Sequence, residues 1–277
     1  MEVTKFFTDL LVVIVLFRKK PEQSDAFISI HSAIGDSSFF PSIFIYDNSP
    51  EAAAVNSQRI TYIHDARNRG ISRAYNEALT SASRQNKGWM LFLDQDTTVE
   101  KGLFKKFTDA VEASDGSVAF VPRMMDRKGQ VSPFYFRAGR GRRTKLRGER
   151  FALSSFRFIN SGLLIRTSAL INAGGYDETI PLDFSDISFG ERLRKVTDHF
   201  EVVDIELNHS FSGTEKPPLE EALRRYHYFL TGAFGMGRNS GSSRLYLIRA
   251  LMHASRLALR YKNFRFLKVF LQRAIDG

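Results

Sequence analysis

Short apolar runs that alternate with helix-patterned segments constrain the fold of this chain more than any other feature. Leu10–Phe17 is a continuous run rich in Val and Ile, which is typical of a strand buried on both faces. Further strands are expected at Ser42–Tyr46, Ile60–His64 and Trp89–Leu93, and apolar residues at helical spacing predict a helix over Ile71–Ser83. Strand–helix alternation with short connections predicts a parallel α/β sheet.

The second half of the chain is less regular. We expect an exposed loop over Arg137–Arg150, where glycine and arginine are frequent, and a predominantly helical pattern from about Pro217 onward. The expected elements are helices at Asp25–Ile34, Lys101–Ala113, Ser185–Val196, Leu219–Phe234, Arg244–Arg260 and Phe264–Ala274, and strands at Val118–Val121, Phe158–Ile165 and Phe200–Ile205.

Composition excludes several classes of protein. With 277 residues and 43% hydrophobic residues, the chain can bury a large core, so general disorder is excluded. The chain has no cysteine, which excludes disulfides, Cys-ligated zinc and a cysteine nucleophile, and fits a reducing compartment. The longest apolar run, Leu10–Phe17, is far below the roughly 20 residues that a membrane span needs. Glu2 and Asp9 precede it, the reverse of a signal peptide.

The net charge of +10 is unevenly placed. Arg137–Arg150 and Arg238–Arg273 are strongly basic, and the rest of the chain is mildly acidic. This confinement, and the lack of a recognised binding motif, argue against a nucleic-acid-binding protein, which remains an alternative. We expect no nucleic-acid partner.

The last helices combine basic and apolar residues. Arg249, His253, Arg256 and Arg260 recur at seven- and four-residue steps and form one stripe of a helix. Residues on the other side of that helix, and four around the next one, are apolar: Leu247, Leu251, Ala254, Ala258, Phe264, Phe266, Phe270 and Leu271. Such helices can lie on an anionic membrane surface. The other interpretation is a helix packed on the body with a solvated basic face.

Polar residues follow the predicted strands directly. Asp47, Asn68 and the pair Asp94 and Asp96 each come after a strand, where parallel α/β sheets bind their ligands. Two carboxylates that straddle one residue can share a divalent cation, since hard cations prefer oxygen ligands. An acidic turn that caps the next helix is an equally good interpretation of Asp94 and Asp96 alone.

The ordered set of short motifs resembles the inverting GT-A glycosyltransferases of family 2, closest to their rhamnosyltransferase-like branch. The resemblance covers roughly residues 10 to 230, and the matching pieces are Val12–Arg18, Ile45–Ser49, Asn68–Asn76, Leu93–Asp96, Asn160–Gly162, Gly174–Glu178, Leu182–Asp186, His209 and Arg225–Tyr228. It implies a Rossmann-like, mixed but mostly parallel sheet flanked by helices. The catalytic domain would span residues 1–215, and a basic amphipathic helical extension would span residues 216–277.

The resemblance also implies roles for residues on the donor side. Asp47 matches the carboxylate that hydrogen-bonds the nucleotide base, and Asn68 and Gly70 match the segment beside the nucleotide. Asp94 matches the residue near the ribose, and Asp96 matches the metal ligand. Taken singly, Asp47 is better explained as a turn former, and Asn68 and Gly70 as a turn at the start of a helix. Taken together, they favour the nucleotide site.

The remaining roles concern the metal and the acceptor. His209 matches a histidine that completes the metal or diphosphate site, and the expected cofactor is Mn²⁺ or Mg²⁺. The motif places the general base at Asp186. Asp183, three residues earlier, is expected to support the base or contact the acceptor, as is Arg225. Capping of a helix N-terminus is the structural alternative for both aspartates.

The expected activity is transfer of a sugar, with inversion, from a dTDP-, UDP- or GDP-sugar to a hydroxyl of a glycan or lipid-linked acceptor. The family branch suggests rhamnose, and the setting it suggests is synthesis of bacterial O-antigen, lipopolysaccharide or capsule, in the cytoplasm or peripherally at the inner face of the plasma membrane. A nucleotidyltransferase on a similar sheet, which would release pyrophosphate, is the closest alternative. A dinucleotide-dependent enzyme is excluded, because residues 16–24 contain no glycine.

Overall fold

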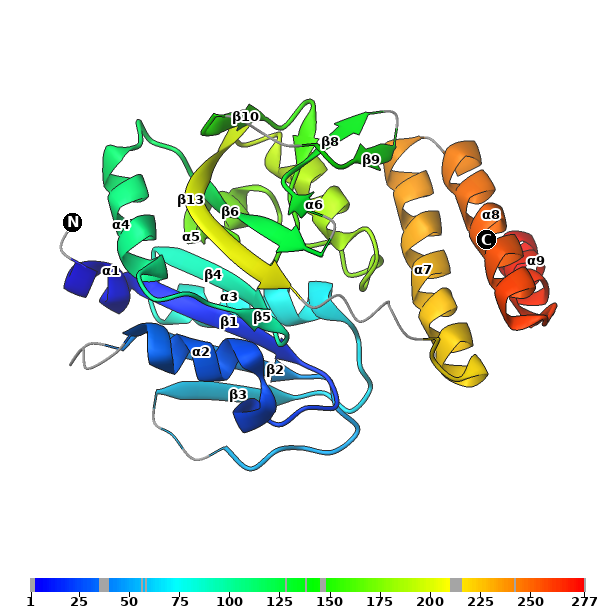
Figure 1. Ribbon diagram of the computed structural model, residues 1–277, viewed down its shortest axis with the longest axis horizontal. Helices are drawn as coiled ribbons and strands as arrows, with labels where there is room; N and C mark the ends of the chain where they lie inside the picture. Colours follow the sequence, from blue (N-terminus) through cyan, green and yellow to red (C-terminus); the bar gives the residue numbers. More distant parts are fainter. Residues whose placement is uncertain are drawn as a thin grey trace.

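A mixed sheet with helices on both faces forms the body of the protein in the computed structural model (Figure 1). The structure describes residues 3–34, 40–55, 57, 59–127, 129–137, 139–144, 148–209, 216–241 and 243–276. The order of strands along the sheet is β10-β13-β6-β12-β4-β1-β2-β3. Their bounds are β1 (Leu10–Leu16), β2 (Ser42–Asp47), β3 (Ile60–His64), β4 (Trp89–Asp94), β6 (Ala119–Asp126), β10 (Arg150–Ala152), β12 (Leu164–Arg166) and β13 (His199–His209).

The sheet is mostly parallel. Strands β4, β1, β2 and β3 run parallel to one another, and β6 and β13 are parallel to each other. Strand β12 is antiparallel to both β4 and β6, and β10 is antiparallel to β13. This mixed arrangement with flanking helices is the GT-A fold class that the sequence predicts.

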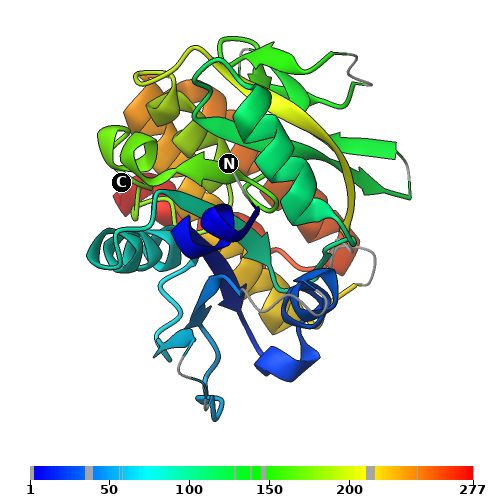
Figure 2. The same ribbon diagram turned by 90° about the vertical axis from the view of Figure 1, so that its left-hand side faces the viewer.

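The helices of the body cover both faces of the sheet (Figures 1 and 2). One hydrophobic cluster packs α1 (Val3–Asp9), α2 (Asp25–Ile34) and α4 (Leu103–Ala113) on the face of β1 that carries Val12. The other cluster packs α3 (Ile71–Arg84), α5 (Thr167–Asn172) and α6 (Ser185–Leu193) on the face that carries Val13. All seven residues of β1 are buried, because alternate side chains enter two cores.

Two predictions for the middle of the chain were wrong. Of Phe158–Ile165, only the end is strand, because Gly162 adopts a φ of +86° and turns the chain before β12. Within Arg137–Arg150, the described part is not a simple loop. Short strands β8 (Phe134–Arg137), β9 (Arg140–Arg142) and β11 (Phe156–Arg157) form a separate antiparallel sheet, while residues 138 and 145–147 lie outside the described part. Strands of two to four residues give too little alternation for a sequence pattern.

The remaining short elements of the body are the 3-10 turn η1 (Pro21–Gln23) and strands β5 (Thr97–Thr98) and β7 (Gly129–Ser132). Strand β5 pairs with β13, and β7 pairs with β6, so both add to the main sheet.

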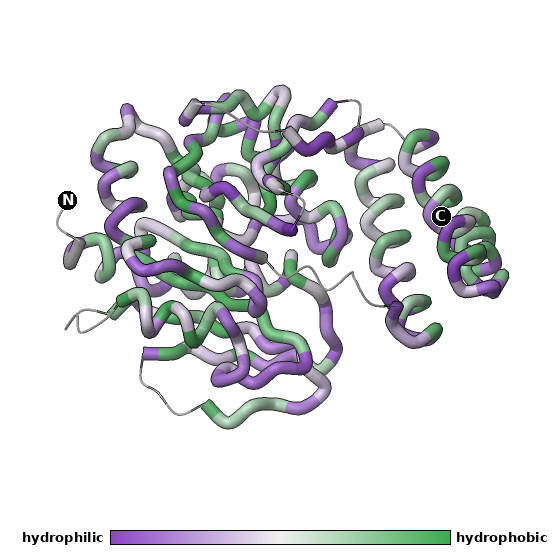
Figure 3. Tube along the Cα trace, in the orientation of Figure 1, coloured by the Kyte–Doolittle hydropathy of each residue, from purple (hydrophilic) through white to green (hydrophobic). Residues whose placement is uncertain are grey.

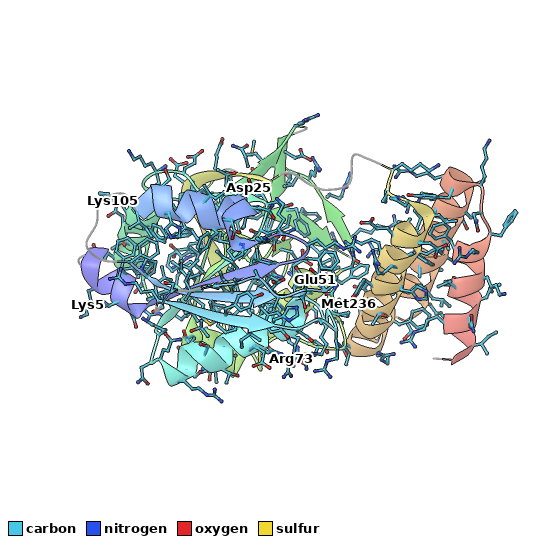
Figure 4. The ribbon with its side chains drawn as sticks, turned by 90° about the horizontal axis from the view of Figure 1, so that it is seen from below. Lys5, Asp25, Glu51, Arg73, Lys105 and Met236 are labelled. Atoms are coloured by element: carbon cyan, nitrogen blue, oxygen red, sulfur yellow. The ribbon has the colours of Figure 1, made fainter. Side chains whose placement is uncertain are left out.

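Three helices pack against one end of the body: α7 (Leu219–Ser240), α8 (Ser243–Tyr261) and α9 (Arg265–Asp276) (Figure 1). They share a third hydrophobic cluster with Ile180 of the body, and Figure 4 shows Met236 of α7 at this boundary. Contact is close, because a Cβ at Gly232 of α7 would lie 2.3 Å from the carbonyl oxygen of Asp183. The predicted domain boundary lies after residue 215. Residues 210–215 are outside the described part of the structure.

The basic stripe predicted on α8 is only partly exposed in the structure. Arg256 and Arg260 are exposed, whereas His253 is half-buried with its ring 4.4 Å from that of Phe229. The apolar side is divided too, since Ala254 is buried and Leu251 is exposed. Three of the four buried residues of α8 are alanines, which lets the helix approach its neighbours closely. None of the described helices is long and apolar enough to cross a membrane.

Candidate active site

The polar strand ends converge on one edge of the sheet, as predicted. In the register of the parallel strands, Val15 of β1 lies opposite Asp94 of β4, and Leu16 lies opposite Asp47 of β2. Asp47 and Asp94 are therefore two strand spacings apart, about 10 Å. The connection from β3 to α3, which carries Asn68 and Gly70, leaves from the same edge.

Asp47 is only 1% exposed and is held by two hydrogen bonds. The backbone N–H of Ser49 donates to Oδ1 (2.8 Å), and the hydroxyl of Tyr62 donates to Oδ2 (2.6 Å). Burial, followed by this hydrogen bond, raises the pKa of Tyr62 to about 12, so the phenol stays protonated and fixes the carboxylate. Sequence patterns gave no indication of the part that Tyr62 plays.

Asp65 is a buried carboxylate that sequence reasoning missed. It accepts hydrogen bonds from the Tyr46 hydroxyl (2.9 Å) and from Nε of Arg69 (2.6 Å). Burial acts to raise its pKa, but the hydrogen bonds from Arg69 and Tyr46 and the charge of Arg69 outweigh burial and lower the pKa to about 2. Asp65 directly follows β3, so the rule that singled out Asp47 and Asp94 would have found it.

Gly70 has a packing function. Its φ is +93°, and a Cβ there would lie 2.2 Å from the carbonyl oxygen of Pro181. That oxygen accepts a hydrogen bond from the N–H of Ile71 (2.7 Å), so the start of α3 is fixed to the segment that leads into α6. The carbonyl of Asn68 accepts a hydrogen bond from the Tyr228 hydroxyl of α7 (3.0 Å). Asn68 and Gly70 thus lie where three parts of the fold meet.

Gln95 fixes the loop between Asp94 and Asp96. Its side-chain oxygen accepts a hydrogen bond from the N–H of Phe17 (2.8 Å), and its carbonyl accepts one from the Ser24 hydroxyl (3.0 Å). The loop is therefore attached to the end of β1 and to the turn before α2. This attachment orients the two aspartates that flank Gln95 along the same edge.

Strand pairing brings the backbone of His209 next to this loop. In the bridge between β5 and β13, His209 lies opposite Thr97, the residue after Asp96. The side chain of His209 lies outside the described part of the structure. Among the side chains that are described, no three of the types His, Cys, Asp and Glu gather to hold a metal ion. The backbone of His209 therefore lies near that of Asp96, and carboxylate and imidazole are ligand types that Mn²⁺ accepts.

Asn160 and Ser161 connect the loop after β4 to the start of α6. The Ser161 hydroxyl accepts a hydrogen bond from the N–H of Asp94 (2.9 Å) and lies 2.7 Å from that of Thr97. The Asn160 amide accepts a hydrogen bond from the Tyr176 hydroxyl (3.0 Å) and donates one to the Ser185 hydroxyl (3.3 Å).

Asp186, the predicted base, lies in the first turn of α6 beside these groups. Burial, together with the charges of Asp183 and Asp94, raises its pKa to about 6, although the N–H of Ile187 donates to Oδ1 (2.8 Å) and opposes this rise. A carboxylate with this pKa is mostly ionised at neutral pH and is a stronger base than an ordinary aspartate. Phe184, the residue just before the helix, has a φ of +70° and so turns the chain sharply into α6.

Two buried tyrosine rings lie in contact near both Asp94 and Asp186. The rings of Tyr75 and Tyr176 are 4.8 Å apart, and burial raises the pKa of each well above the usual value. The charges of Asp94 and Asp186 both add to that rise in each tyrosine. Asp94 and Asp186, the predicted base, therefore flank one small region of the molecule.

Asp183 forms an ion pair with Arg225 of α7. Two guanidinium nitrogens donate to its two carboxylate oxygens, one of them at 2.8 Å. Burial raises the pKa of Asp183, and the charge of Arg225 partly opposes this. The structure therefore brings together Asp94, Asp183, Asp186 and Arg225, and places Asp47 and Asn68 further along the same edge.

The chain is similar to a known protein family and to several solved structures. The sequence model described as Glycosyl transferase family 2 matches residues 30–179. Comparison with curated protein sequences finds no match. Among solved structures, residues 1–349 of Staphylococcus aureus TarS in complex with UDP share 12% identity with this chain, at a TM-score of 0.53, over 90% of this chain and 72% of that one.

Two longer structures are similar as well. S. aureus TarS shares 12% identity at a TM-score of 0.52, over 83% of this chain and 40% of that one. GalNAc-T7 with UDP, GalNAc and Mn²⁺ shares 13% identity at a TM-score of 0.49, over 72% of this chain and 43% of that one. The chain thus spans about two fifths of the length of these two, and at such identities the likeness to TarS shows the fold alone. The family model spans more than half of the chain and includes the strands that end in Asp47 and Asp94. The chain therefore belongs to glycosyl transferase family 2.

Proposed function

We propose that this protein transfers a sugar, with inversion, from a nucleoside-diphosphate sugar to an acceptor hydroxyl. The observation that carries the proposal is the placement of Asp186. Its carboxylate has a pKa of about 6, and Asp94, which follows a strand of the donor side, contributes to that pKa. One base beside one donor site is what a single displacement needs.

On the donor side, Asp47 binds the base of the nucleotide, Asn68 contacts the nucleotide and Asp94 contacts the ribose. A structure of TarS, which shares the fold, contains UDP, and this supports a UDP-sugar as the first donor to test. The dTDP- and GDP-sugars are tested beside it. Rhamnose is the sugar that we propose, and synthesis of a bacterial surface polysaccharide such as O-antigen or capsule is the setting.

In the reaction, Asp186 takes the proton of the acceptor hydroxyl as its oxygen bonds to the anomeric carbon. The bond from that carbon to the phosphate oxygen breaks on the opposite side, and the nucleoside diphosphate leaves. Asp96 and His209 would hold Mn²⁺ or Mg²⁺, which supplies positive charge to the leaving diphosphate. Asp183, held by Arg225, keeps the segment before α6 in place and contacts the acceptor.

The acceptor enters beside α7. A cavity of 460 Å³ opens there, next to Pro181, and is lined in part by Arg224, His227 and Tyr228. Cationic and hydroxyl groups at this position suit a glycan that carries phosphate. We therefore propose a lipid-linked glycan as the acceptor and a cytoplasmic location at the inner face of the plasma membrane.

The donor is tested by thermal unfolding with UDP-, GDP- and dTDP-sugars, each with Mn²⁺, Mg²⁺ or EDTA. We expect one nucleotide to stabilise the wild type only when metal is present. Asp96→Ala should lose this effect, while Asp115→Ala, a change at an exposed aspartate, should keep it. No stabilisation by any nucleotide would contradict the proposal.

The products separate the proposed reaction from its alternatives. A glycosyltransferase releases a nucleoside diphosphate, whereas a nucleotidyltransferase releases pyrophosphate. NMR of the product should show the anomeric configuration opposite to that of the donor. Salt-sensitive nucleic-acid binding that nucleoside diphosphates do not compete with would favour the nucleic-acid-binding alternative.

A further inference from the structure

Exposed large hydrophobic side chains are concentrated on the last two helices. Among the described residues, ten such side chains are exposed, and eight of them lie between residues 247 and 275. These eight are Leu247, Ile248, Leu251, Met252, Leu259, Phe264, Leu271 and Ile275. A concentration of exposed apolar side chains on two neighbouring helices suggests an interaction site, since exposed apolar residues that lie scattered are ordinary.

Helix α8 is apolar on two opposite sides. Its buried side consists of Tyr246 and three alanines, including Ala250, and packs within the third hydrophobic cluster. Each residue of an α-helix advances about 100°, so Ile248, Met252 and Leu259 lie within about 40° of one another and about opposite Ala250. Their exposed fractions are 56%, 53% and 79%.

Helix α9 repeats the arrangement. Phe266 and Phe270 are buried against the neighbouring helices. Phe264, just before the helix, and Leu271 and Ile275 lie within about 40° of one another, on the side away from Phe266. Their exposed fractions are 80%, 57% and 83%. We call these three residues and Ile248, Met252 and Leu259 the outer apolar face.

The surroundings of the outer apolar face are strongly cationic. Residues 238–273 contain nine Lys and Arg and no acidic residue. Arg256, Arg260, Lys262 and Lys268 are exposed, and Figure 3 shows hydrophilic and hydrophobic segments interleaved along both helices. Arg265 differs, because it is paired with Glu220 of α7. Helices α8 and α9 are the outermost elements at this end of the molecule (Figure 1).

We propose that the outer apolar face binds an anionic lipid bilayer, with α8 and α9 lying in the plane of the interface. Apolar side chains would enter the boundary of the acyl chains while the neighbouring lysines and arginines contact lipid phosphates. A second copy of the chain suits the face less well. A two-fold symmetric contact sets the same patch of both copies together, so these lysines and arginines would lie near those of the other copy and repel them.

The position of α7 connects this surface with the site. Helix α7 contacts the body through Asp183 and Asn68, and it also packs against α8 and α9. Packed helices are separated by 8–10 Å, so the bilayer would lie about 20 Å from the segment that leads into Asp186. A headgroup-linked glycan can cross that distance. This last step rests on the proposed function, whereas binding to the bilayer does not.

The proposal is tested by flotation of the full chain with vesicles, without donor or acceptor. We expect the wild type to bind vesicles of phosphatidylcholine mixed with phosphatidylglycerol, and to bind pure phosphatidylcholine at least about tenfold more weakly. The combined variant Ile248→Ser, Met252→Ser and Leu259→Ser should bind the anionic vesicles at least about tenfold more weakly than the wild type. Thermal unfolding confirms that it folds.

The matched control changes exposed apolar residues elsewhere. Ile28 and Ile171 are 52% and 50% exposed, and Ile28→Ser with Ile171→Ser should leave vesicle binding unchanged. Three results would overturn the proposal: no binding by the wild type, equal binding to both kinds of vesicle, or a lipid-free dimer that the triple variant abolishes. Nucleotide-dependent stabilisation, measured without lipid, tests the proposed function separately.

Discussion

Replacing Asp186 by Asn should abolish transfer and at the same time stabilise the protein at neutral pH. The asparagine keeps the shape of the side chain and an Oδ1 that accepts the N–H of Ile187. It removes the negative charge that burial, Asp183 and Asp94 all disfavour. Loss of the base removes proton transfer, which contributes roughly 10²–10⁴-fold to a rate.

The gain in stability follows from the pKa. In the folded protein the pKa of Asp186 is about 6, against 3.8 when it is unperturbed. Because one pKa unit corresponds to about 1.4 kcal/mol, the ionised side chain costs the folded state about 3 kcal/mol. Below pH 3.8 the carboxyl is protonated in both states, and the cost vanishes. It grows between pH 3.8 and 6 and is constant above.

Urea unfolding of both proteins at several pH values, in EDTA and without donor, measures this difference. The variant should be more stable by up to about 3 kcal/mol at pH 8, and the difference should shrink toward zero at pH 4. A variant that is less stable than the wild type at pH 8, or a difference that does not vary with pH, would refute the reasoning about the charge of Asp186.

The remaining predictions concern the pH dependence of the activity, the packing of Gly70 and the hydrogen bond of Ser161. The kcat/KM of the wild type should fall about tenfold per pH unit below about pH 6, because the base becomes protonated; a flat profile between pH 5 and 7 would contradict this. Gly70→Ala should cost more than about 3 kcal/mol in urea unfolding, since its Cβ would meet the Pro181 carbonyl at 2.2 Å. Gly102→Ala has a similar φ but nothing within 4 Å, so it should cost only about 1 kcal/mol. Ser161→Ala leaves the N–H of Asp94 without its acceptor, which should cost about 1–3 kcal/mol and weaken donor binding, measured by titration calorimetry.

Local patterns determined the body of the fold. The apolar run of β1 and the helical spacing of α3 depend on residues close in sequence, and their predicted bounds differ from the observed ones by one residue at most. The polar strand ends were predictable for the same reason, because parallel strands end at one edge of a sheet. The short strands β8 and β9 were not predictable, since they carry no apolar alternation.

The site needed the tertiary structure. The sequence placed Asp94, because it ends a strand. Only the core that β4, β12 and α6 share brings Asp186 near Asp94, and burial of Asp186 raises its pKa. The pairing of Arg225 with Asp183 likewise depends on how α7 docks. The sequence also determined that the last helices are basic and apolar, whereas their packing decided which apolar side chains remain exposed. Periodicity specifies which residues share a face, and only contacts between distant segments specify what covers that face.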